Sequence, residues 1–137
     1  MTAVVDELFR ANGALLAAGD ELAATAGLTS ARWQVLGRLA DDGPMTVSEL
    51  ARRRGMRRQS AQEAVDRLAR DGLVEKAPNA ADRRAPSIRL LAAGRAALAA
   101  IEPARAAWAR EAGGDLTVEE LVQLASLLGR LRGAGVR

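Results

Sequence analysis

Residues 56–71, MRRQSAQEAVDRLARD, contain the most informative pattern in this 137-residue chain. Their apolar side chains recur at i, i+3, i+4 and i+7, the spacing that places them on one face of a helix. The spacing therefore predicts an amphipathic helix with one face in a core and the other exposed. The predicted core positions are Ala61, Ala64, Val65 and Leu68, and the residues that point away include Gln59, Gln62, Glu63, Asp66 and Arg70.

A shorter amphipathic pattern, TVSELARRRG, directly precedes this helix. Thr46 and Glu49 have the T-x-x-E spacing of a capping box, in which each side chain satisfies a free backbone donor at the helix start. Gly55 is expected to end the helix. Two helices joined by a short turn are typical of a helix-turn-helix.

The segment LVEKAPNAADRRAPSIRLL follows the second helix. Its two strand-like runs, residues 73–76 and 87–90, flank a loop that is bounded by Pro78 and Pro86. A strand pair of this kind after a helix-turn-helix predicts a winged helix-turn-helix. Asp82, Arg83 and Arg84 would then lie near the tip of the wing.

Three motifs in this order resemble the MarR (multiple antibiotic resistance regulator) family of bacterial transcription regulators: LTSARWQVLGRL, TVSELARRRGMRRQSAQEAVDRLARDGLVEK and NAADRRAPSIRLLAAGRAAL. The second is similar to the paired helices of the family followed by "GLV", and the third contains the D-x-R wing signature at Asp82 and Arg84. The chain departs from the family at Leu91-Ala92, where members commonly have Leu-Thr, and this removes a capping hydroxyl.

The resemblance implies a mainly α fold, a winged helix-turn-helix with flanking N- and C-terminal dimerisation helices and a short β-wing. Within a single integrated domain, we expect a dimerisation helix in residues 1–27, the DNA-binding region in residues 28–91 and further dimerisation helices in residues 92–137.

Helical periodicity predicts the individual flanking helices. The first runs to about Ala26, and the second, residues 31–40, buries apolar side chains. A long helix over residues 92–112 is interrupted by Pro103, which should kink it. A second capping box opens the last helix, and Gly133 closes it. The side chains behind these predictions are Trp33, Leu36, Leu39 and Ala40 in the second helix, and Thr117 and Glu120 in the last capping box.

An apolar stripe runs along the last helix. In the family, the terminal helices interlock with those of a second subunit, so the resemblance implies a homodimer. The alternative is that the stripe packs on the core of its own subunit. The stripe consists of Leu121, Leu124, Leu128 and Leu131.

Positive charge is concentrated in the middle of the chain. Residues 31–95 carry 14 basic and 8 acidic side chains, a net charge of +6, whereas residues 1–30 carry −3 and residues 96–137 are neutral. A basic segment of this kind is the electrostatic footprint that a nucleic-acid partner requires. Double-stranded DNA is therefore the expected partner, at a near-palindromic site because a two-fold symmetric dimer presents two equal half-sites.

The start of the helix in residues 56–71 is the expected site of base readout. Arg can donate two hydrogen bonds to guanine, and Gln can form a bidentate pair with adenine. The alternative is an ordinary solvated charged face. The acidic residues on this helix, Glu63 and Asp66, are expected to pair with Arg67, Arg70 or cytosine amino groups. The expected DNA contacts are Arg57, Arg58, Gln59, Ser60 and Gln62.

In the family, the Arg that matches Arg84 enters the minor groove, and the Asp that matches Asp82 braces the wing. A narrow minor groove attracts inserted Arg because it concentrates negative potential. Arg83 is a second candidate contact. The alternative is that both arginines are ordinary loop charges.

The chain contains neither Cys nor His. A thiol sensor is therefore excluded, and the usual transition-metal sites are disfavoured, so we expect no cofactor. Catalysis by Cys or by His-activated Ser is also excluded, and we expect no enzyme. No apolar run approaches the ~18 residues of a membrane span, and the N-terminus lacks a signal-peptide pattern, so we expect a cytoplasmic protein without a membrane partner.

We expect a repressor that is released by a small aromatic or apolar ligand. The family implies a ligand site between the dimer helices and the winged segment, where Phe9, Trp33 and Trp108 are candidate lining residues. The alternative for both Trp residues is ordinary core packing. The alternative function is a winged-helix interaction or architectural protein without ligand regulation.

Overall fold

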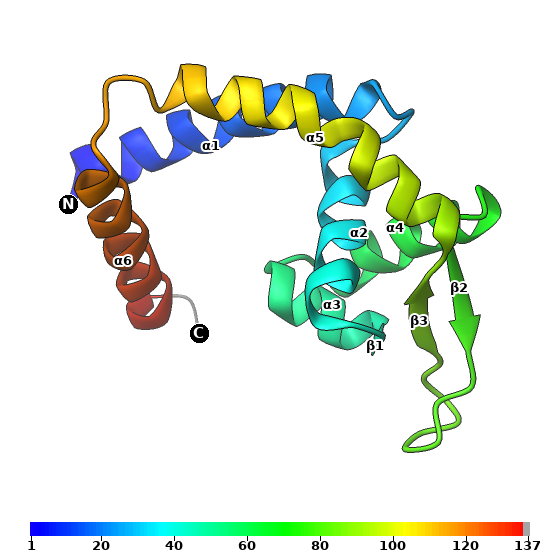
Figure 1. Cartoon of the computed structure of the whole chain (residues 1–137). Helices are drawn as coiled ribbons and strands as arrows, with labels where there is room; N and C mark the ends of the chain where they lie inside the picture. Colours follow the sequence, from blue (N-terminus) through cyan, green and yellow to red (C-terminus); the bar gives the residue numbers. More distant parts are fainter. Residues whose placement is uncertain (136–137) are drawn as a thin grey trace. The chain divides into compact units, whose positions relative to one another are not determined.

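The computed structural model describes residues 1–135, with the side chains of residues 1–133. The chain is mainly helical and includes one small antiparallel sheet (Figure 1). The elements are α1 (Thr2–Ala24), α2 (Ser30–Asp42), β1 (Met45–Thr46), α3 (Val47–Arg54), α4 (Arg58–Arg70), β2 (Val74–Ala77), β3 (Ser87–Leu90), α5 (Ala92–Ala112) and α6 (Val118–Gly135).

The chain divides into two compact units, Met1–Pro103 and Ala104–Arg137. The division falls inside α5, which continues through Pro103. The first unit contains the predicted helix-turn-helix and wing, and the second contains the last part of α5 together with α6. Within the described residues, no helix has the length and apolar character that crossing a membrane requires.

The core of the first unit forms around α4. The four predicted core residues of this helix are all buried, which confirms the i, i+3, i+4, i+7 interpretation. They pack with fully buried side chains from α2, α3 and the sheet. Leu36, Leu50, Leu68 and Ile88 are among the largest of these buried side chains.

The helix boundaries follow local capping chemistry. Thr46 accepts a hydrogen bond from Glu49 N at 3.2 Å, and Glu49 Oε2 accepts one from Thr46 N at 2.9 Å, so the predicted capping box is confirmed. The same reciprocal pair forms between Thr117 and Glu120 at 2.8 and 3.1 Å. Gly55 ends α3 in the left-handed conformation, at φ 63°, which only glycine adopts without strain.

Three details of the sequence interpretation were wrong. Ala40 is exposed, and Val35 occupies the buried position on α2 instead. Trp33 is only partly buried, at the edge of the core. Gly133 does not close α6, because the helix continues to Gly135 and Gly133 has no positive φ.

The sheet has the strand order β1-β3-β2, and both pairings are antiparallel. The hairpin β2–β3 is the predicted wing, with Val74 opposite Leu90 and Lys76 opposite Ile88. Strand β1 was not predicted. It contains only Met45 and Thr46, which is too short for an alternating pattern, and it forms by pairing with Ile88 and Ser87 at the free edge of β3.

Gly94 shows how closely α5 approaches the wing. A Cβ atom at this position would lie 2.4 Å from Leu73 O and 2.5 Å from Leu90 Cδ1. The first of these atoms belongs to the backbone and cannot rotate away. The start of α5 can therefore pack against the base of the hairpin only because residue 94 has no side chain.

We expect Gly94→Ala to destabilise the protein by about 1–3 kcal/mol, the usual cost of overpacking a well-filled site. Gly37→Ala is the matched control, because a Cβ there meets nothing within 4 Å. Since Ala is the better helix former by about 1 kcal/mol, the control should unfold at an equal or higher urea concentration. Urea denaturation, monitored by circular dichroism, measures the unfolding midpoint of each variant. Equal midpoints for the two variants would contradict the close approach.

Candidate nucleic-acid interface

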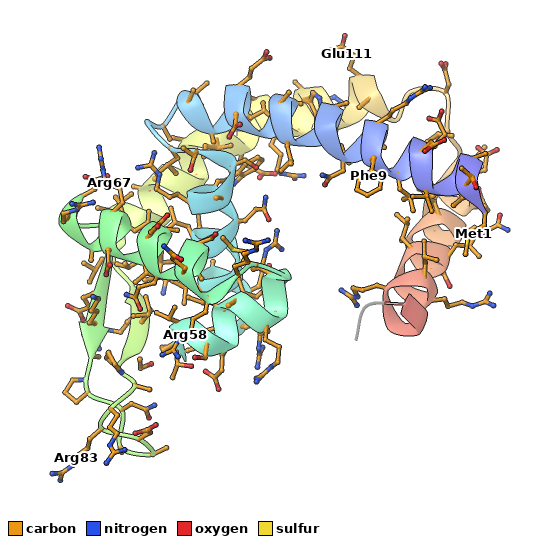
Figure 2. All side chains as sticks on the ribbon, turned by 180° about the vertical axis from the view of Figure 1, so that it is seen from behind. Met1, Phe9, Arg58, Arg67, Arg83 and Glu111 are labelled. Carbon is orange, nitrogen blue, oxygen red and sulfur yellow. The ribbon has the colours of Figure 1, made fainter. Side chains whose placement is uncertain are left out.

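The outer face of α4 is open to solvent along its first turns. Arg57 is the N-cap residue, and Arg58, Gln59 and Ser60 form the exposed first turn. Gln62 lies one turn further on and is partly exposed. Because the opposite face of the helix is buried, these polar side chains can only face outward. Figure 2 shows Arg58 at the start of the helix.

Arginines at the end of α3 fix the turn that leads into α4. Arg54 Nη2 donates to Gln34 Oε1 on α2 at 2.6 Å, and Arg53 Nη1 lies 2.8 Å from Asp42 Oδ2. Arg38 reaches the same carboxylate oxygen at 3.1 Å. The hydrogen bonds from Arg53 and then Arg38 lower the pKa of Asp42, so this carboxylate remains charged and holds both guanidinium groups. Burial lowers the pKa of Arg54, but an Arg remains protonated at neutral pH.

A groove of about 160 Å³ lies between α3, α4 and the wing. It brings together three of the residues predicted to bind DNA, Arg58 and Gln62 from α4 and Arg84 from the wing. The start of α3 forms another wall of the groove. The full lining is Thr46, Val47, Ser48, Arg58, Gln62, Lys76, Arg84, Ala85, Pro86 and Ile88.

The tip of the wing is held by its own polar side chains. Asp82 Oδ1 accepts a hydrogen bond from Arg84 N at 2.9 Å, and Asp82 O accepts one from Ala85 N at 3.2 Å. These bonds form a tight turn in which the backbone of Arg84 is fixed while its side chain is exposed. Arg83 lies in the same loop, at the far end of the wing from the helices (Figure 2).

Asn79 is a second brace of the wing that the sequence interpretation missed. Its Nδ2 donates to Ala85 O at 3.1 Å, and its Oδ1 accepts from Ala81 N at 3.1 Å. The side chain therefore joins the two sides of the loop. The available signal was the dipeptide Pro78-Asn79, because Asn commonly hydrogen-bonds the backbone two residues further on in turns.

Within the described residues, some arginines of the first unit form ion pairs and others do not. Arg38, Arg53, Arg67 and Arg89 each pair with a carboxylate on the surface. Among the residues that the structure describes, Arg57, Arg58, Arg83 and Arg84 form no such pair, so the charges at the start of α4 and in the wing are not neutralised. Guanidinium groups of this kind are available to phosphates and to base edges.

The expectation for the acidic residues of α4 was wrong in part. Asp66 pairs with Lys76 on β2, with 2.8 Å between Asp66 Oδ1 and Lys76 Nζ, rather than with an arginine of its own helix. Arg67 instead pairs with Asp71 at 3.2 Å. Asp66 Oδ1 also accepts from Gln62 Nε2 at 3.0 Å, and the bonds from Lys76 and Gln62 lower the pKa of Asp66. The partner from β2 could not be identified from periodicity, because it comes from another element.

Ser48 and Lys76 also line the groove but were not predicted as site residues. Ser48 lies in the first turn of α3, at the positive end of the helix dipole, which favours an anion. Lys76 is the only lysine in the chain. Lys76 could not be predicted as a site residue, because only the tertiary fold brings the hairpin beside α4.

The three aromatic residues of the expected ligand pocket lie in different surroundings. Phe9 is 73% exposed and lines an open hollow of about 320 Å³ with three neighbours on α1, Val5, Leu8 and Asn12. Trp33 packs against the edge of the core of the first unit. Trp108 belongs to the second unit and is partly exposed.

The sequence of the chain is similar to known proteins over most of its length. Residues 26–85 match the sequence profile of the MarR family. An uncharacterized protein of Mycobacterium tuberculosis is 38% identical over 98 residues, which cover 72% of this chain and 68% of the relative.

Solved structures share the fold. A probable transcriptional regulator from Pseudomonas aeruginosa is 31% identical, with a TM-score of 0.79 over 93% of this chain and 96% of its own. A mutant MarR from E. coli, solved in complex with operator DNA, is 22% identical, with a TM-score of 0.85 over 94% and 93%. BpsR of Bordetella bronchiseptica, from a study of how 6-hydroxynicotinic acid regulates its DNA binding, is 24% identical, with a TM-score of 0.85 over 96% and 94%.

The matched profile spans the paired helices and most of the wing, the same segments whose free arginines surround the groove. The regulator from Pseudomonas aeruginosa extends the likeness over nearly the whole chain at an identity above 30%. These findings identify the protein as a member of the MarR family of transcription regulators, with the winged helix-turn-helix DNA-binding fold of that family.

Proposed function

We propose that this protein binds a near-palindromic site in duplex DNA as a homodimer and represses transcription there until a small aromatic or apolar ligand releases it. The observation that carries the DNA-binding part is the groove in which Arg58, Gln62 and Arg84 meet. Residues from two separate elements converge there with no carboxylate among the lining residues. The similarity to the E. coli protein that was solved with operator DNA also supports DNA binding.

In this proposal, α4 enters the major groove and the wing reaches the adjacent minor groove. Arg57, Arg58, Gln59, Ser60 and Gln62 supply the contacts from the exposed start of α4. Arg84, with Arg83 beside it, supplies the minor-groove contact, and Asp82 braces the turn that fixes Arg84. Repression is the proposed output, because a protein bound across two successive turns of DNA at a promoter can block polymerase.

The proposed dimer, built from the terminal helices expected within residues 1–27 and 92–137, rests on the exposed apolar side chains of α1 and α6. On α6, Leu124 and Leu128 are 47% and 40% exposed. On α1, Phe9 is 73% and Leu15 is 55% exposed. Leu124 and Leu128 are four residues apart and so lie on one face of α6, and an exposed apolar face of this kind favours an interaction site. A second copy of the chain is the proposed occupant, because a two-fold symmetric dimer would present two equal α4 helices to the proposed near-palindromic site.

The proposed ligand control rests on the structural neighbour BpsR, whose DNA binding is regulated by 6-hydroxynicotinic acid. The candidate lining residues are Phe9, Trp33 and Trp108. A ligand can shift the separation of the two α4 helices only by as much as it prefers one separation over the other. The ligand can therefore change DNA affinity by no more than its own affinity differs between the DNA-binding separation of the α4 helices and the other separation.

The first prediction of this proposal compares the DNA contacts of α4 with those of the wing. Selection of bound fragments from random duplexes should yield a preferred site. Arg58→Ala or Gln62→Ala should then cost about 1–3 kcal/mol and relax the preference at one position. Arg84→Ala should weaken binding with less change in major-groove preference, because minor-groove readout is degenerate. Affinity should fall steeply with salt for every variant.

Arg95→Ala is the matched control for charge, because Arg95 is exposed but does not line the groove. It should keep the preference of the wild-type protein. Variants at positions 58, 62 and 84 that all bind the selected site like the wild type would remove α4 and the wing from the interface.

The second prediction concerns the dimer. Leu124→Arg should dissociate it, because an unpaired charge in a dry interface is strongly unfavourable. Ser126→Arg on the same helix is the control, and it should remain dimeric because Ser126 is outside the apolar stripe. Light scattering at micromolar concentration gives the mass, and circular dichroism verifies that each variant is folded. A monomeric wild-type protein would refute the proposal.

The third prediction is a titration with aromatic carboxylates, starting with 6-hydroxynicotinic acid. A regulating ligand should quench Trp fluorescence saturably and lower operator affinity about 5–150-fold, which corresponds to a coupling of about 1–3 kcal/mol. Quenching without any change in operator affinity would show a pocket that does not regulate. A broad panel in which no compound binds would favour a DNA-binding protein without ligand control.

A further inference from the structure

Two glutamines on the outer face of α4 are each followed, four residues later, by a carboxylate. Gln62 Nε2 donates to Asp66 Oδ1 at 3.0 Å, and Gln59 Nε2 donates to Glu63 Oε1 at 3.4 Å. Residues four apart on a helix are neighbours, so each pair forms within the exposed surface of the helix itself. The glutamines are also the side chains that could read bases in the proposed complex.

A carboxylate fixes which way a glutamine amide points. The amide has a donor end and an acceptor end, whereas an ionised carboxylate can only accept hydrogen bonds. The nitrogen of Gln62 must therefore face Asp66, and its oxygen must face away. Without the carboxylate, the amide could turn over and present either end to a ligand.

Asp66 is in turn anchored to the wing. The oxygen that accepts from Gln62 also accepts from Lys76 Nζ at 2.8 Å. Lys76 lies on β2, and its backbone is paired with Ile88 in the middle of the sheet. The carboxylate therefore has a fixed position between helix and hairpin. Gln62 and Lys76 both line the groove that also contains Arg58 and Arg84.

The second pair, Gln59 and Glu63, lacks these features. Its bond of 3.4 Å is longer than the usual range for hydrogen bonds of this type. Among the described residues, Glu63 forms no ion pair that would hold it in place. Glu63 is exposed, whereas Asp66 is only partly so. This pair is a natural internal control for the first.

We propose that Asp66 is a specificity-determining positioning residue, which orients Gln62 for adenine and ties that orientation to the wing through Lys76. The inference rests on the proposed DNA-binding function. One hydrogen of Gln62 Nε2 is taken by Asp66, and the other lies beside Oε1. This leaves a donor next to an acceptor, the pair that matches N7 and the N6 amino group of adenine in the major groove.

The proposal also explains why an acidic side chain is present on this face of α4. A carboxylate near DNA is repelled by the phosphates and lowers affinity for every sequence. A role in orienting Gln62 compensates for this cost by adding discrimination between bases. The repulsion lowers affinity for every sequence, whereas the orientation of Gln62 raises the preference for one base. Replacing the carboxylate should therefore leave the overall affinity equal or higher and lower the base preference.

The test is Asp66→Asn in the full-length protein. Asn can donate as well as accept, so it no longer dictates the orientation of Gln62, and it loses the ion pair with Lys76. We expect affinity for random duplex DNA to stay equal or to rise. The preference at the single position read by Gln62 should fall, within the about 5–150-fold range that a bidentate contact supplies. A residue that merely stabilised the fold would lower both affinities together.

Three further variants complete the experiment. Gln62→Ala should abolish the same preference, and adding Asp66→Asn to it should cause no further loss. Lys76→Met keeps the carboxylate but removes its anchor, so it should cause a smaller loss at the same position, and it serves as the second probe if Asp66→Asn does not fold. Glu63→Gln is the control, and it should leave that position unchanged.

The outcomes distinguish the inference from the function on which it rests. A wild-type protein that selects no duplex sequence would overturn the proposed function, and the inference with it. A wild-type protein that selects a sequence while folded Asp66→Asn and Lys76→Met keep the full preference would overturn the inference alone. Equal losses of affinity for random and for selected duplex DNA would also overturn the inference, because they would indicate that Asp66 only stabilises the fold.

Discussion

The burial of one face of α4 is the interaction on which the rest of the structure depends. Ala61 and Ala64 are small enough for α4 to approach its neighbours closely, and Val65 and Leu68 fill the remaining space. Full burial of a side chain such as Val65 or Leu68 contributes about 1.5–3 kcal/mol. Because the helix cannot rotate without exposing these side chains, its polar residues are held facing outward. The direction of the exposed face is thus a consequence of the core.

Electrostatic pairing determines which charges remain available on that face. Arg38 and Arg53 share Asp42, and Arg67 pairs with Asp71, so these cations stabilise the helix-turn-helix itself. Within the part of the chain that the structure describes, the guanidinium groups of Arg58 and Arg84 form no ion pair and lie beside the groove. The net positive charge of the middle of the chain is therefore less informative than its distribution. Some of these charges pair with one another within the helix-turn-helix, whereas others lie unpaired around the groove among the described residues.

The wing shows how an exposed loop can be held by hydrogen bonds from its own side chains. Asp82 and Asn79 satisfy backbone groups within the loop, so the turn is held by its own side chains. Gly94 allows α5 to approach the base of the hairpin at Leu73, and the Lys76–Asp66 pair joins the hairpin to α4. The position of Arg84 relative to α4 thus depends on contacts at both ends of the wing. These contacts also link the side chains of α4 to those of the hairpin.

The sequence by itself determined the helices, the hairpin of the wing, and the exposed and buried faces of α4. The period of Ala61, Ala64, Val65 and Leu68, the two capping boxes and the glycine stop at Gly55 are all local signals, because each depends on residues within about two helical turns. The resemblance to the MarR family implied, through the D-x-R signature, the turn that Asp82 braces. The family and the fold class could be inferred from these signals together with the order of the motifs.

Only the tertiary structure decided which side chains meet. Strand β1 exists because β3 offers a free edge, and Asp66 pairs with Lys76 because the hairpin returns beside α4. Arg58 and Arg84 are 26 positions apart in the chain, yet they line one groove. Periodicity gives the face of a helix on which a residue lies, but not the element that packs beside it. The packing of the elements alone therefore decided which exposed charges form ion pairs. It also decided which side chains line the groove.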